Sequence, residues 1–422
     1  MERLDRRTLL RRGAQWSLAA GAVGLVGCGA PERWTWRPQA APLDLGVTHT
    51  QDSLDGDRAA VARAEDVLRG LGDAWQVHHL MGFGTLSPEP SPGVYRWETL
   101  DARMALTRRT GGRTVLTAAV APDWMKGGLA GTTDWSTVEV APLPQHVGDF
   151  ADLVGRAVAR YPQIEVVQVW NELKGFFDAA SNTWDVAGYL RLYDAVAAAV
   201  RRTRPGVRIG GPYISMNLWD DADAGGFPSE VSGPWGVVDR RSLDVVDAWL
   251  AARPDADLLV VDGGTLTRDA GLATDPATAA EYFATVTSWL RARTALPVWW
   301  AEVYPSSPPA ATAVATLEAV AALAEAGASA AMLWQPEAGD GFPFAALWTD
   351  TALGDGGRPT DLTATWRWLV PRLRAGGVSI GRTDDGALLG FRAADGTVLV
   401  NTTDEAQGSL PAFGTSLAAA GG

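Results

Sequence analysis

Runs of apolar residues alternate along this chain with segments in which apolar residues recur every three or four positions. The runs are typical of strands buried on both faces, and the second pattern is typical of helices with one buried face. The pattern predicts strands at 43–49, 75–81, 114–120, 164–170, 207–213, 257–261, 296–301 and 328–334. It predicts helices at 57–71, 97–109, 146–160, 186–202, 242–252, 276–293, 310–326 and 362–374. Eight successive strand–helix units are the number that a closed (β/α)8 barrel requires, so we predict this α/β fold over residues 43–375.

The predicted connections differ in length between the two ends of the barrel. Those from helix to strand are short, such as 161–163 and 205–206, whereas those after the third, fifth and eighth strands are long. The connection at 214–241 is the longest and is rich in Gly, Pro and Asp. Long loops gathered at one end of a compact domain usually build a site, and in barrels this is the end where the strands finish.

Two of the predicted strands finish on acidic side chains. The apolar run at 166–170 leads into Asn171 and Glu172, and the run that begins at 296 leads into Glu302. The two glutamates are 302 − 172 = 130 residues apart, or three further strand–helix units, so we expect them to face each other across the barrel mouth. A pair of carboxyl groups about 5–5.5 Å apart is what a retaining glycosidase uses to protonate the leaving oxygen and to attack the sugar.

The stretch Trp170-Asn171-Glu172 and the following Lys174-Gly175-Phe176-Phe177 resemble clan A of the glycoside hydrolases. With Asp123-Trp124-Met125 and the Pro-Gly-Val-Tyr-Arg-Trp turn at 92–97, the chain is most similar to glycoside hydrolase family 39 over about residues 43–374. The resemblance implies that Glu172 is the general acid/base, that Glu302 is the nucleophile, and that Asn171 donates to the sugar 2-hydroxyl. One departure is Leu173, where the family usually has proline, and it implies a different backbone after the acid.

Further candidates for substrate binding stand near the ends of predicted strands. They are His49, His79, Trp124, Asp262, Tyr304 and Trp334. The structural alternative is core packing for Trp334 and a buried, hydrogen-bonded group for each histidine. Glu337, after the eighth strand, is an alternative to Glu302 as the second carboxylate at the mouth.

Composition excludes some classes of function and favours others. The net charge of −13 argues against nucleic-acid binding, and the 19 tryptophans favour a carbohydrate substrate, because sugar faces stack on flat apolar rings. The four histidines show no metal-binding spacing and no phosphate-binding glycine motif follows a strand, so we predict no metal and no other cofactor. A second hypothesis is a lipid-anchored carbohydrate-binding protein built on a non-catalytic barrel.

The first 28 residues are typical of an export signal. Arg6 and Arg7 precede an apolar segment at 14–27 that is too short to span a bilayer as a mature helix. Cys28, the sole cysteine, ends a Leu-Val-Gly-Cys sequence that resembles a bacterial lipobox, which implies cleavage before Cys28 and lipidation of its thiol. We therefore predict an exported lipoprotein anchored to the outer face of the membrane, with a tether at 29–42. Short alternating runs at 376–422 predict a small β appendage and a frayed tail.

Overall fold

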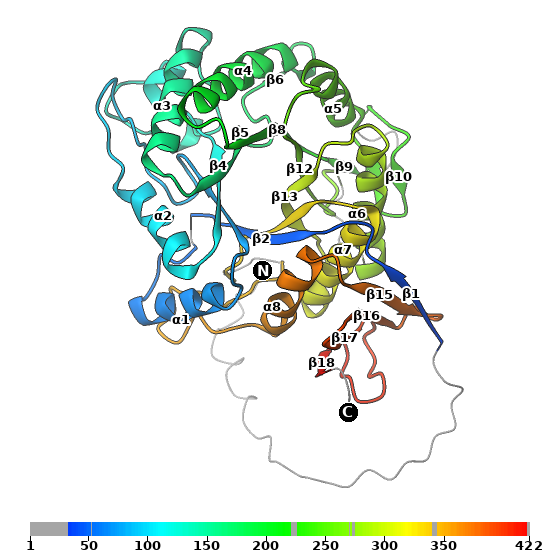
Figure 1. Ribbon diagram of the computed structural model, residues 1–422. Helices are drawn as coiled ribbons and strands as arrows, with labels where there is room; N and C mark the ends of the chain where they lie inside the picture. The colour runs from blue at the N-terminus through cyan, green and yellow to red at the C-terminus, as the bar shows by residue number, and fades with distance from the viewer. Residues whose placement is uncertain are drawn as a thin grey trace, which may run out of the picture. The chain divides into compact units, whose positions relative to one another are not determined.

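Eight parallel strands form a closed barrel, which confirms the predicted (β/α)8 fold. The computed structural model describes residues 33–51, 53–220, 226–269, 271, 275–339 and 344–419. The barrel strands, in their order around the ring, are β2 (Asp44–Thr48), β3 (Trp75–His79), β4 (Arg113–Ala118), β5 (Ile164–Val169), β8 (Arg208–Ser215), β12 (Leu258–Gly264), β13 (Val298–Tyr304) and β14 (Ala330–Trp334). Figure 1 shows them as a ring enclosed by helices.

The helices that follow these strands are close to the predicted ranges. They are α1 (Arg58–Arg69), α2 (Glu98–Thr110), α3 (Val147–Arg160), α4 (Val186–Thr203), α5 (Arg240–Ala252), α6 (Pro276–Arg291), α7 (Thr312–Ala326) and α8 (Asp361–Arg374). Capping residues determine where several of these helices begin and end. Asp57 and Asp275 accept hydrogen bonds from the first free amides of α1 and α6, and Gly111 and Gly327 end α2 and α7 in the left-handed conformation.

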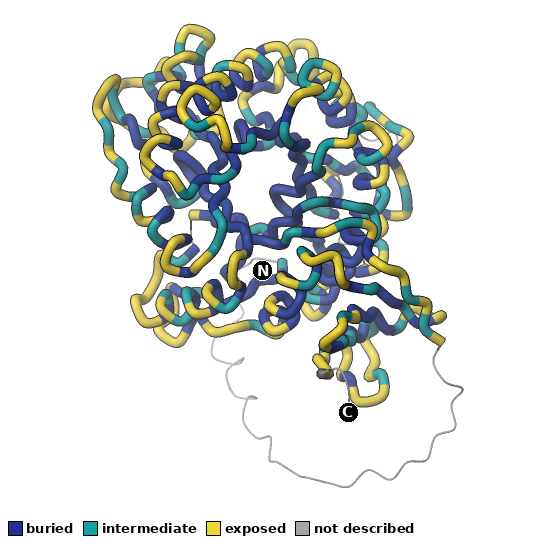
Figure 2. Tube along the Cα trace, in the orientation of Figure 1, coloured by how far each residue is buried: buried dark blue, intermediate teal, exposed yellow. Residues whose placement is uncertain are grey.

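The barrel strands are buried on both faces. Alternate side chains, including Trp75, Val260 and Trp299, fill the interior of the ring, and the intervening ones pack against the helices. Figure 2 shows this as a ring of buried backbone inside helices with exposed outer faces. Double-sided burial explains why these strands are continuous apolar runs in the sequence rather than alternating ones.

The loops that follow the strands contain shorter elements. A hairpin of β6 (Phe177–Asp178) and β7 (Thr183–Trp184) follows β5, and the sheet of β9 (Leu218–Trp219), β10 (Ser232–Gly233) and β11 (Gly236–Val238) follows β8. The 3-10 helices are η1 (Asp123–Lys126), η2 (Trp135–Thr137), η3 (Pro144–His146) and η4 (Pro309–Ala311). Most of this added structure lies after β4, β5 and β8, in loops at the strand ends where a site is expected.

A five-stranded antiparallel sheet follows the barrel in sequence and also contains the first described strand. Its order is β1 (Trp34–Pro38), β15 (Ser379–Thr383), β16 (Leu388–Ala393), β17 (Gly396–Asn401) and β18 (Thr415–Ala419). The tether prediction is therefore wrong for residues 34–38, because β1 pairs with β15 from Trp34↔Thr383 to Pro38↔Ser379. The predicted signal segment and Cys28 lie outside the described residues.

Helix α7 is apolar around most of its circumference because it is covered on several sides. Within the described residues, 309–326 is the one helical stretch long and apolar enough to cross a membrane, but 67% of it is buried inside the fold. Beside the barrel and α6, it meets the five-stranded sheet, where Arg382 forms ion pairs with Glu318 and Glu325. Burial in the protein accounts for its composition.

Candidate functional site

Three carboxylates meet at the mouth of the barrel. One oxygen each from Glu172, Asp262 and Glu302 lies within 4.8 Å of the corresponding oxygens of the other two. Glu172 follows β5, while Asp262 and Glu302 lie near the ends of β12 and β13. Asp262 and Glu302 are buried and Glu172 is partly exposed, so the cluster is open to solvent on the Glu172 side.

A bulge in β13 turns Glu302 into the site. Trp300 pairs with Val261 in the neighbouring strand, but Asp262 pairs with Glu302, so Ala301 is an extra residue at this point of the ladder. Strict alternation would place Glu302 on the helix side of the strand with Trp300. The bulge instead aligns it with Asp262, as bulges next to active sites commonly re-aim a side chain.

A second bulge places a tyrosine beside Glu302. Strand β8 pairs with β12 through Pro212 and then Ile214, leaving Tyr213 as the extra residue, with a φ of 52°. The fully buried Tyr213 hydroxyl donates a hydrogen bond to Oε1 of Glu302 at 2.8 Å. The sequence shows Tyr213 only as the last residue of an apolar run, so its role was missed.

The turn after β5 holds Glu172 in a strained conformation. Trp170, Glu172 and Leu173 have φ values of 70°, 48° and 50°, a region that large side chains rarely adopt. The turn is closed by the Trp170 indole, which donates to the Lys174 carbonyl at 2.6 Å, and by the Lys174 amide, which donates to the Asn171 carbonyl. Proline cannot occupy position 173 in this turn, because its ring fixes φ near −65°.

The charges of the cluster are partly balanced by Lys174. Its Nζ lies 3.0 Å from Oε2 of Glu172 and 2.7 Å from Oε1 of Glu139, which belongs to the loop after β4. Burial opposes the charge of Lys174, but the two carboxylates outweigh it and raise its pKa. Neither Lys174 nor Glu139 was predicted to be functional, since loop residues far apart in sequence carry no signal of their pairing.

Burial and mutual repulsion favour protonation within the cluster. Burial, and next the charge of Glu172, raise the pKa of Glu302 to about 8 against the partial opposition of Tyr213 and Lys174. Burial, followed by the charges of Glu172 and Glu302, also raises the pKa of Asp262 well above its usual value. Tyr304 donates to Oδ2 of Asp262 at 3.1 Å, while Oδ1 has no hydrogen-bond partner within the described residues.

Four other candidates from the sequence are linked to this cluster. Asn171, beside Glu172, has its Oδ1 3.5 Å from Nε2 of the buried His79, and burial lowers the pKa of His79 to about 3. Tyr304 contacts Asp262, and its ring lies 5.3 Å from that of Trp334. These contacts bring Trp334 to the edge of the site.

The two remaining candidates, His49 and Trp124, contact residues other than the carboxylates. The buried ring of His49 stacks on His78 at 4.7 Å, and burial lowers the pKa of His49 to about 3. Trp124 donates to the Glu89 carbonyl and packs edge-on against His146. None of these described contacts reaches the carboxylate cluster.

Glu337, the alternative to Glu302 as the second carboxylate at the mouth, has a structural role. Its two oxygens accept from the amides of Leu54 and Thr351, the Thr351 hydroxyl and the Trp348 indole. With four donors engaged, this buried carboxylate fastens the loop after β14 to the loop after β2.

Among the described residues, these three carboxylates also form the group of side chains that could bind a metal ion. Three carboxylate oxygens suit a hard cation such as Mg²⁺ or Ca²⁺. The Lys174 ammonium, 3.0 Å from Glu172, already supplies a positive charge and opposes a second cation at that oxygen. The arrangement fits proton transfer between carboxyl groups better than metal binding.

Together, the fold and the site define a (β/α)8 barrel with a carboxylate cluster at the carboxyl ends of its strands. The structure is similar to a monomeric β-xylosidase from Caulobacter crescentus CB15, with a TM-score of 0.57 and 16% identity over 89% of this chain and 77% of that one. It is also similar to a GH39 enzyme from Xanthomonas axonopodis pv. citri, with a TM-score of 0.55 and 16% identity over 86% and 73% of the two chains.

A third similar structure is the family 30 subfamily 8 xylanase Xyn30A from Clostridium acetobutylicum, with a TM-score of 0.52 and 12% identity over 88% of this chain and 83% of that one. No protein-family model and no curated protein sequence matches this chain. At such identities the likeness establishes the (β/α)8 fold alone.

Proposed function

We propose that this protein is a retaining glycoside hydrolase that acts by double displacement, with Glu302 as nucleophile and Glu172 as general acid/base. The observation that carries the proposal is the approach of Glu172 and Glu302, with carboxylate oxygens within 4.8 Å at the barrel mouth. Retaining enzymes keep their two carboxyl groups about 5–5.5 Å apart, whereas inverting enzymes need about 6.5–9.5 Å to admit a water molecule.

The two steps assign a task to each group. In the first, an oxygen of Glu302 bonds to the sugar C1 while Glu172 gives its proton to the departing oxygen. In the second, Glu172 takes a proton from water, whose oxygen bonds to C1 and releases Glu302. The free Oδ1 of Asp262 is available to accept from a sugar hydroxyl, and Asn171 lies beside the acid to orient the ring.

Proton placement in the cluster follows from its geometry. Glu302, with a pKa of about 8, holds a proton at neutral pH in the ligand-free protein, yet attack requires it to be ionised. Because the two glutamates are close, the charge of Glu172 opposes ionisation of Glu302. Tyr213 stabilises the ionised form of Glu302 through its hydrogen bond.

The test compares wild type with Glu172→Gln and Glu302→Gln on aryl β-xylosides, β-glucosides and β-mannosides. We expect Glu302→Gln to be inactive on all of them. Glu172→Gln should lose about 10²–10⁴-fold of its activity on substrates whose leaving group needs a proton. The loss of activity should be much smaller on dinitrophenyl glycosides, whose leaving group departs without one. Glu98→Gln, an exposed change at the start of α2, is the matched control.

Two further measurements decide the mechanism. A 2-deoxy-2-fluoro glycoside should label Glu302 covalently, and NMR of the first-formed sugar should show retained anomeric configuration. Label on another residue, inverted product, or full activity in either glutamine variant would contradict the proposed roles.

We also propose that the protein is exported and anchored by a lipid on Cys28. The support is the sequence at 6–28, which lies outside the described residues. The test is detergent phase partition of cell extracts. We expect wild type in the detergent phase and the Cys28→Ser variant in the aqueous phase. Equal partition of the two proteins would contradict the lipid anchor.

A further inference from the structure

Lys174 forms a bridge between two carboxylates at the barrel mouth. Its Nζ lies 2.7 Å from Oε1 of Glu139 and 3.0 Å from Oε2 of Glu172. The lysine side chain is 30% exposed, and burial by itself would favour its neutral form. The two carboxylates outweigh burial and raise the pKa of Lys174, so the bridge contains an ammonium ion at neutral pH.

The backbone brings Glu139 to this bridge through a close contact with Gly175. A Cβ atom on residue 175 would lie 2.4 Å from the amide nitrogen of Ala141 and 2.4 Å from the carbonyl oxygen of Glu139, and the φ of Gly175 is 79°. Both observations require glycine at this position. The loop after β4 therefore packs directly on the turn that follows the acid, with the Glu139 carboxylate beside Lys174.

The loop after β4 is itself held in place just before Glu139. The Lys126 side chain, which is only 3% exposed, pairs with Asp123 and donates to the Thr137 carbonyl at 2.8 Å. The amide of Val140 donates to the same carbonyl. These contacts on either side of Glu139 fix its backbone, so the position of its carboxylate does not depend on the ion pair alone.

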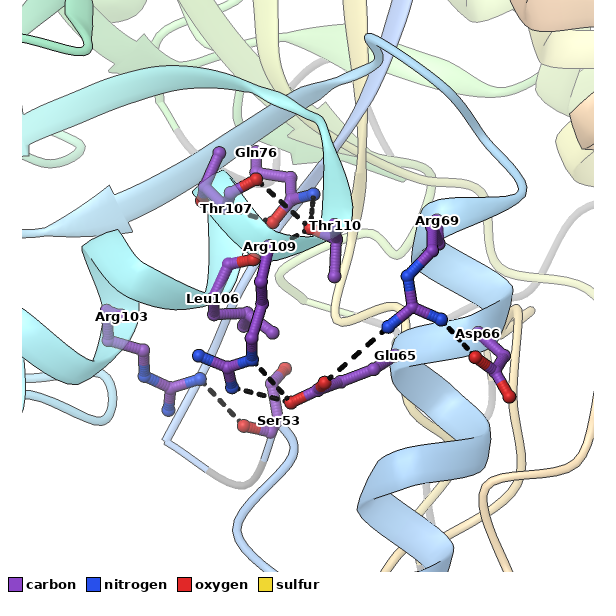
Figure 3. Close-up of polar contacts among 10 residues, drawn as sticks. All are labelled: Ser53, Glu65, Asp66, Arg69, Gln76, Arg103, Leu106, Thr107, Arg109 and Thr110. Carbon is purple, nitrogen blue, oxygen red and sulfur yellow. Dashed lines mark hydrogen bonds and ion pairs between the residues drawn. The ribbon is translucent and has the colours of Figure 1, made fainter.

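The arginines around Glu139 have partners of their own. Three other charged side chains line the same cavity as Glu139: Asp55, Arg103 and Arg109. Figure 3 shows that Arg103 donates to a carbonyl of the loop after β2 and that Arg109 pairs with a glutamate of α1. Asp55 has the same charge as Glu139. The ion pair of Glu139 is accordingly with Lys174.

The proposed reaction requires Glu172 to change its charge twice. It gives a proton in the first step and takes one in the second. Asp262 and Glu302, whose oxygens lie within 4.8 Å, favour the protonated form of Glu172, whereas Lys174 favours the ionised form. If Lys174 were paired with Glu172 alone, each protonation would leave a partly buried ammonium without a counterion, which is costly.

We propose that Glu139 is a positioning residue for the acid/base, because it gives Lys174 a counterion in both protonation states of Glu172. The inference rests on the proposed function, in which Glu172 acts in both steps. Lys174 occupies Oε2 of Glu172, which leaves Oε1 to pass the proton to the departing oxygen and to receive one from water. The Glu139–Lys174 pair stays neutral throughout, so the proton transfer leaves no charge unpaired.

The experiment measures kcat/KM against pH for Glu139→Gln, alone and together with Lys174→Met. Two glycosides of the sugar that wild type cleaves best are used, a phenyl glycoside that needs a proton on its leaving group and a dinitrophenyl glycoside that does not. Glu165→Gln is the matched control. Its side chain is 42% exposed against 50% for Glu139, and it also lies 2.7 Å from its cation, Arg113, but at the opposite end of β5 from Glu172.

We expect Glu139→Gln to lower kcat/KM about tenfold on the phenyl glycoside and much less on the dinitrophenyl glycoside. The alkaline limb of the phenyl profile should move down by about one pH unit, because the unpaired ammonium of Lys174 then opposes protonation of Glu172. Adding Lys174→Met removes that ammonium and should return the alkaline limb to its wild-type position or above it. Glu165→Gln should match wild type.

Three results would overturn this role of Glu139 while leaving the hydrolase intact. They are an unchanged alkaline limb in Glu139→Gln, equal losses on both glycosides, and a double variant whose alkaline limb stays with that of Glu139→Gln. The last two would show that Glu139 acts by holding the loop rather than by pairing with Lys174. A wild type that cleaves neither glycoside would instead overturn the proposed function, and this role with it.

Discussion

The pKa of Glu302 is set by opposing contacts of single residues. Burial removes water from the carboxylate and the nearby Glu172 adds a like charge, and together they raise its pKa to about 8. The Tyr213 hydroxyl and the Lys174 ammonium act in the opposite direction. A nucleophile must be ionised to attack, so these two residues lower the pH at which the proposed reaction can begin.

Replacing Tyr213 with phenylalanine tests this balance. Without the 2.8 Å hydrogen bond, ionised Glu302 loses a stabilising partner, so its pKa rises further. We expect the acidic limb of kcat/KM against pH to move up by about one pH unit and the rate below that limb to fall about tenfold. Tyr282→Phe is the control, because this buried hydroxyl donates to the Met216 carbonyl instead. An acidic limb that moves equally in both variants would contradict a specific role for Tyr213.

Position 173 shows how a departure from a family pattern can indicate a local backbone conformation. The resembled family usually has proline after its catalytic acid, and this chain has Leu173 at the corresponding position. The structure shows the consequence, since Leu173 has a φ of 50° that proline cannot adopt. The same turn carries Lys174 to the carboxylate of Glu172. The departure could be read from the sequence, but the contact that it permits could not.

Among the elements, the barrel strands show what a hydrophobic pattern can and cannot predict. The apolar runs locate all eight strands, because burial on both faces makes each run continuous. The same continuity hides which side chains face the interior, and the bulges at Tyr213 and Ala301 break the alternation without changing the pattern. The sequence therefore predicts that Glu302 ends a strand, but not that a bulge aligns it with Asp262.

Strand β1 was mistaken for a tether for a related reason. Its neighbouring prolines and polar residues suggest an extended linker, and nothing local indicates pairing. Its hydrogen bonds are to β15, more than 300 residues later. Pro38 is compatible with this because β1 is an edge strand, where a missing amide donor leaves no gap in the sheet.

The junction between β15 and α7 is predicted to depend on Arg382. Its guanidinium pairs with Glu318, which is 4% exposed, and with the less buried Glu325. Arg382→Met would leave Glu318 buried without its partner, so we expect the free energy of unfolding to fall by about 2–3 kcal/mol. Urea unfolding at neutral pH measures this loss.

Two variants separate that effect from the loss of a surface charge. Arg372→Met removes an ion pair to the exposed Asp395, and we expect a change below about 1 kcal/mol. Pairing Arg382→Met with Glu318→Met removes both charges and should restore most of the stability. A double variant no more stable than Arg382→Met alone would show that the buried carboxylate is not the cause.

At the scale of the whole molecule, the strained and charged features gather at the barrel mouth. Seven of the nine non-glycine residues with positive φ in the described part of the chain follow five of the barrel strands or lie near their carboxyl ends: Leu54, Phe83, Trp170, Glu172, Leu173, Tyr213 and Gln335. The three clustered carboxylates lie at this same end. Strain and buried charge lower stability, so the rest of the fold must offset them, as is common at functional sites.

This concentration predicts how stability depends on pH. Folding raises the pKa of Glu302 from 4.5 to about 8, so the folded state favours the protonated form. Its contribution to stability is complete below about pH 4.5 and is lost as the pH rises through 8, by about 5 kcal/mol. Glu302→Gln cannot ionise, so thermal unfolding should show it matching wild type at pH 4 and exceeding it at pH 8–9. Glu281→Gln, an exposed change on α6, should follow wild type throughout. If Glu302→Gln lost stability with pH as steeply as wild type, the ionisation of Glu302 would not be the cause.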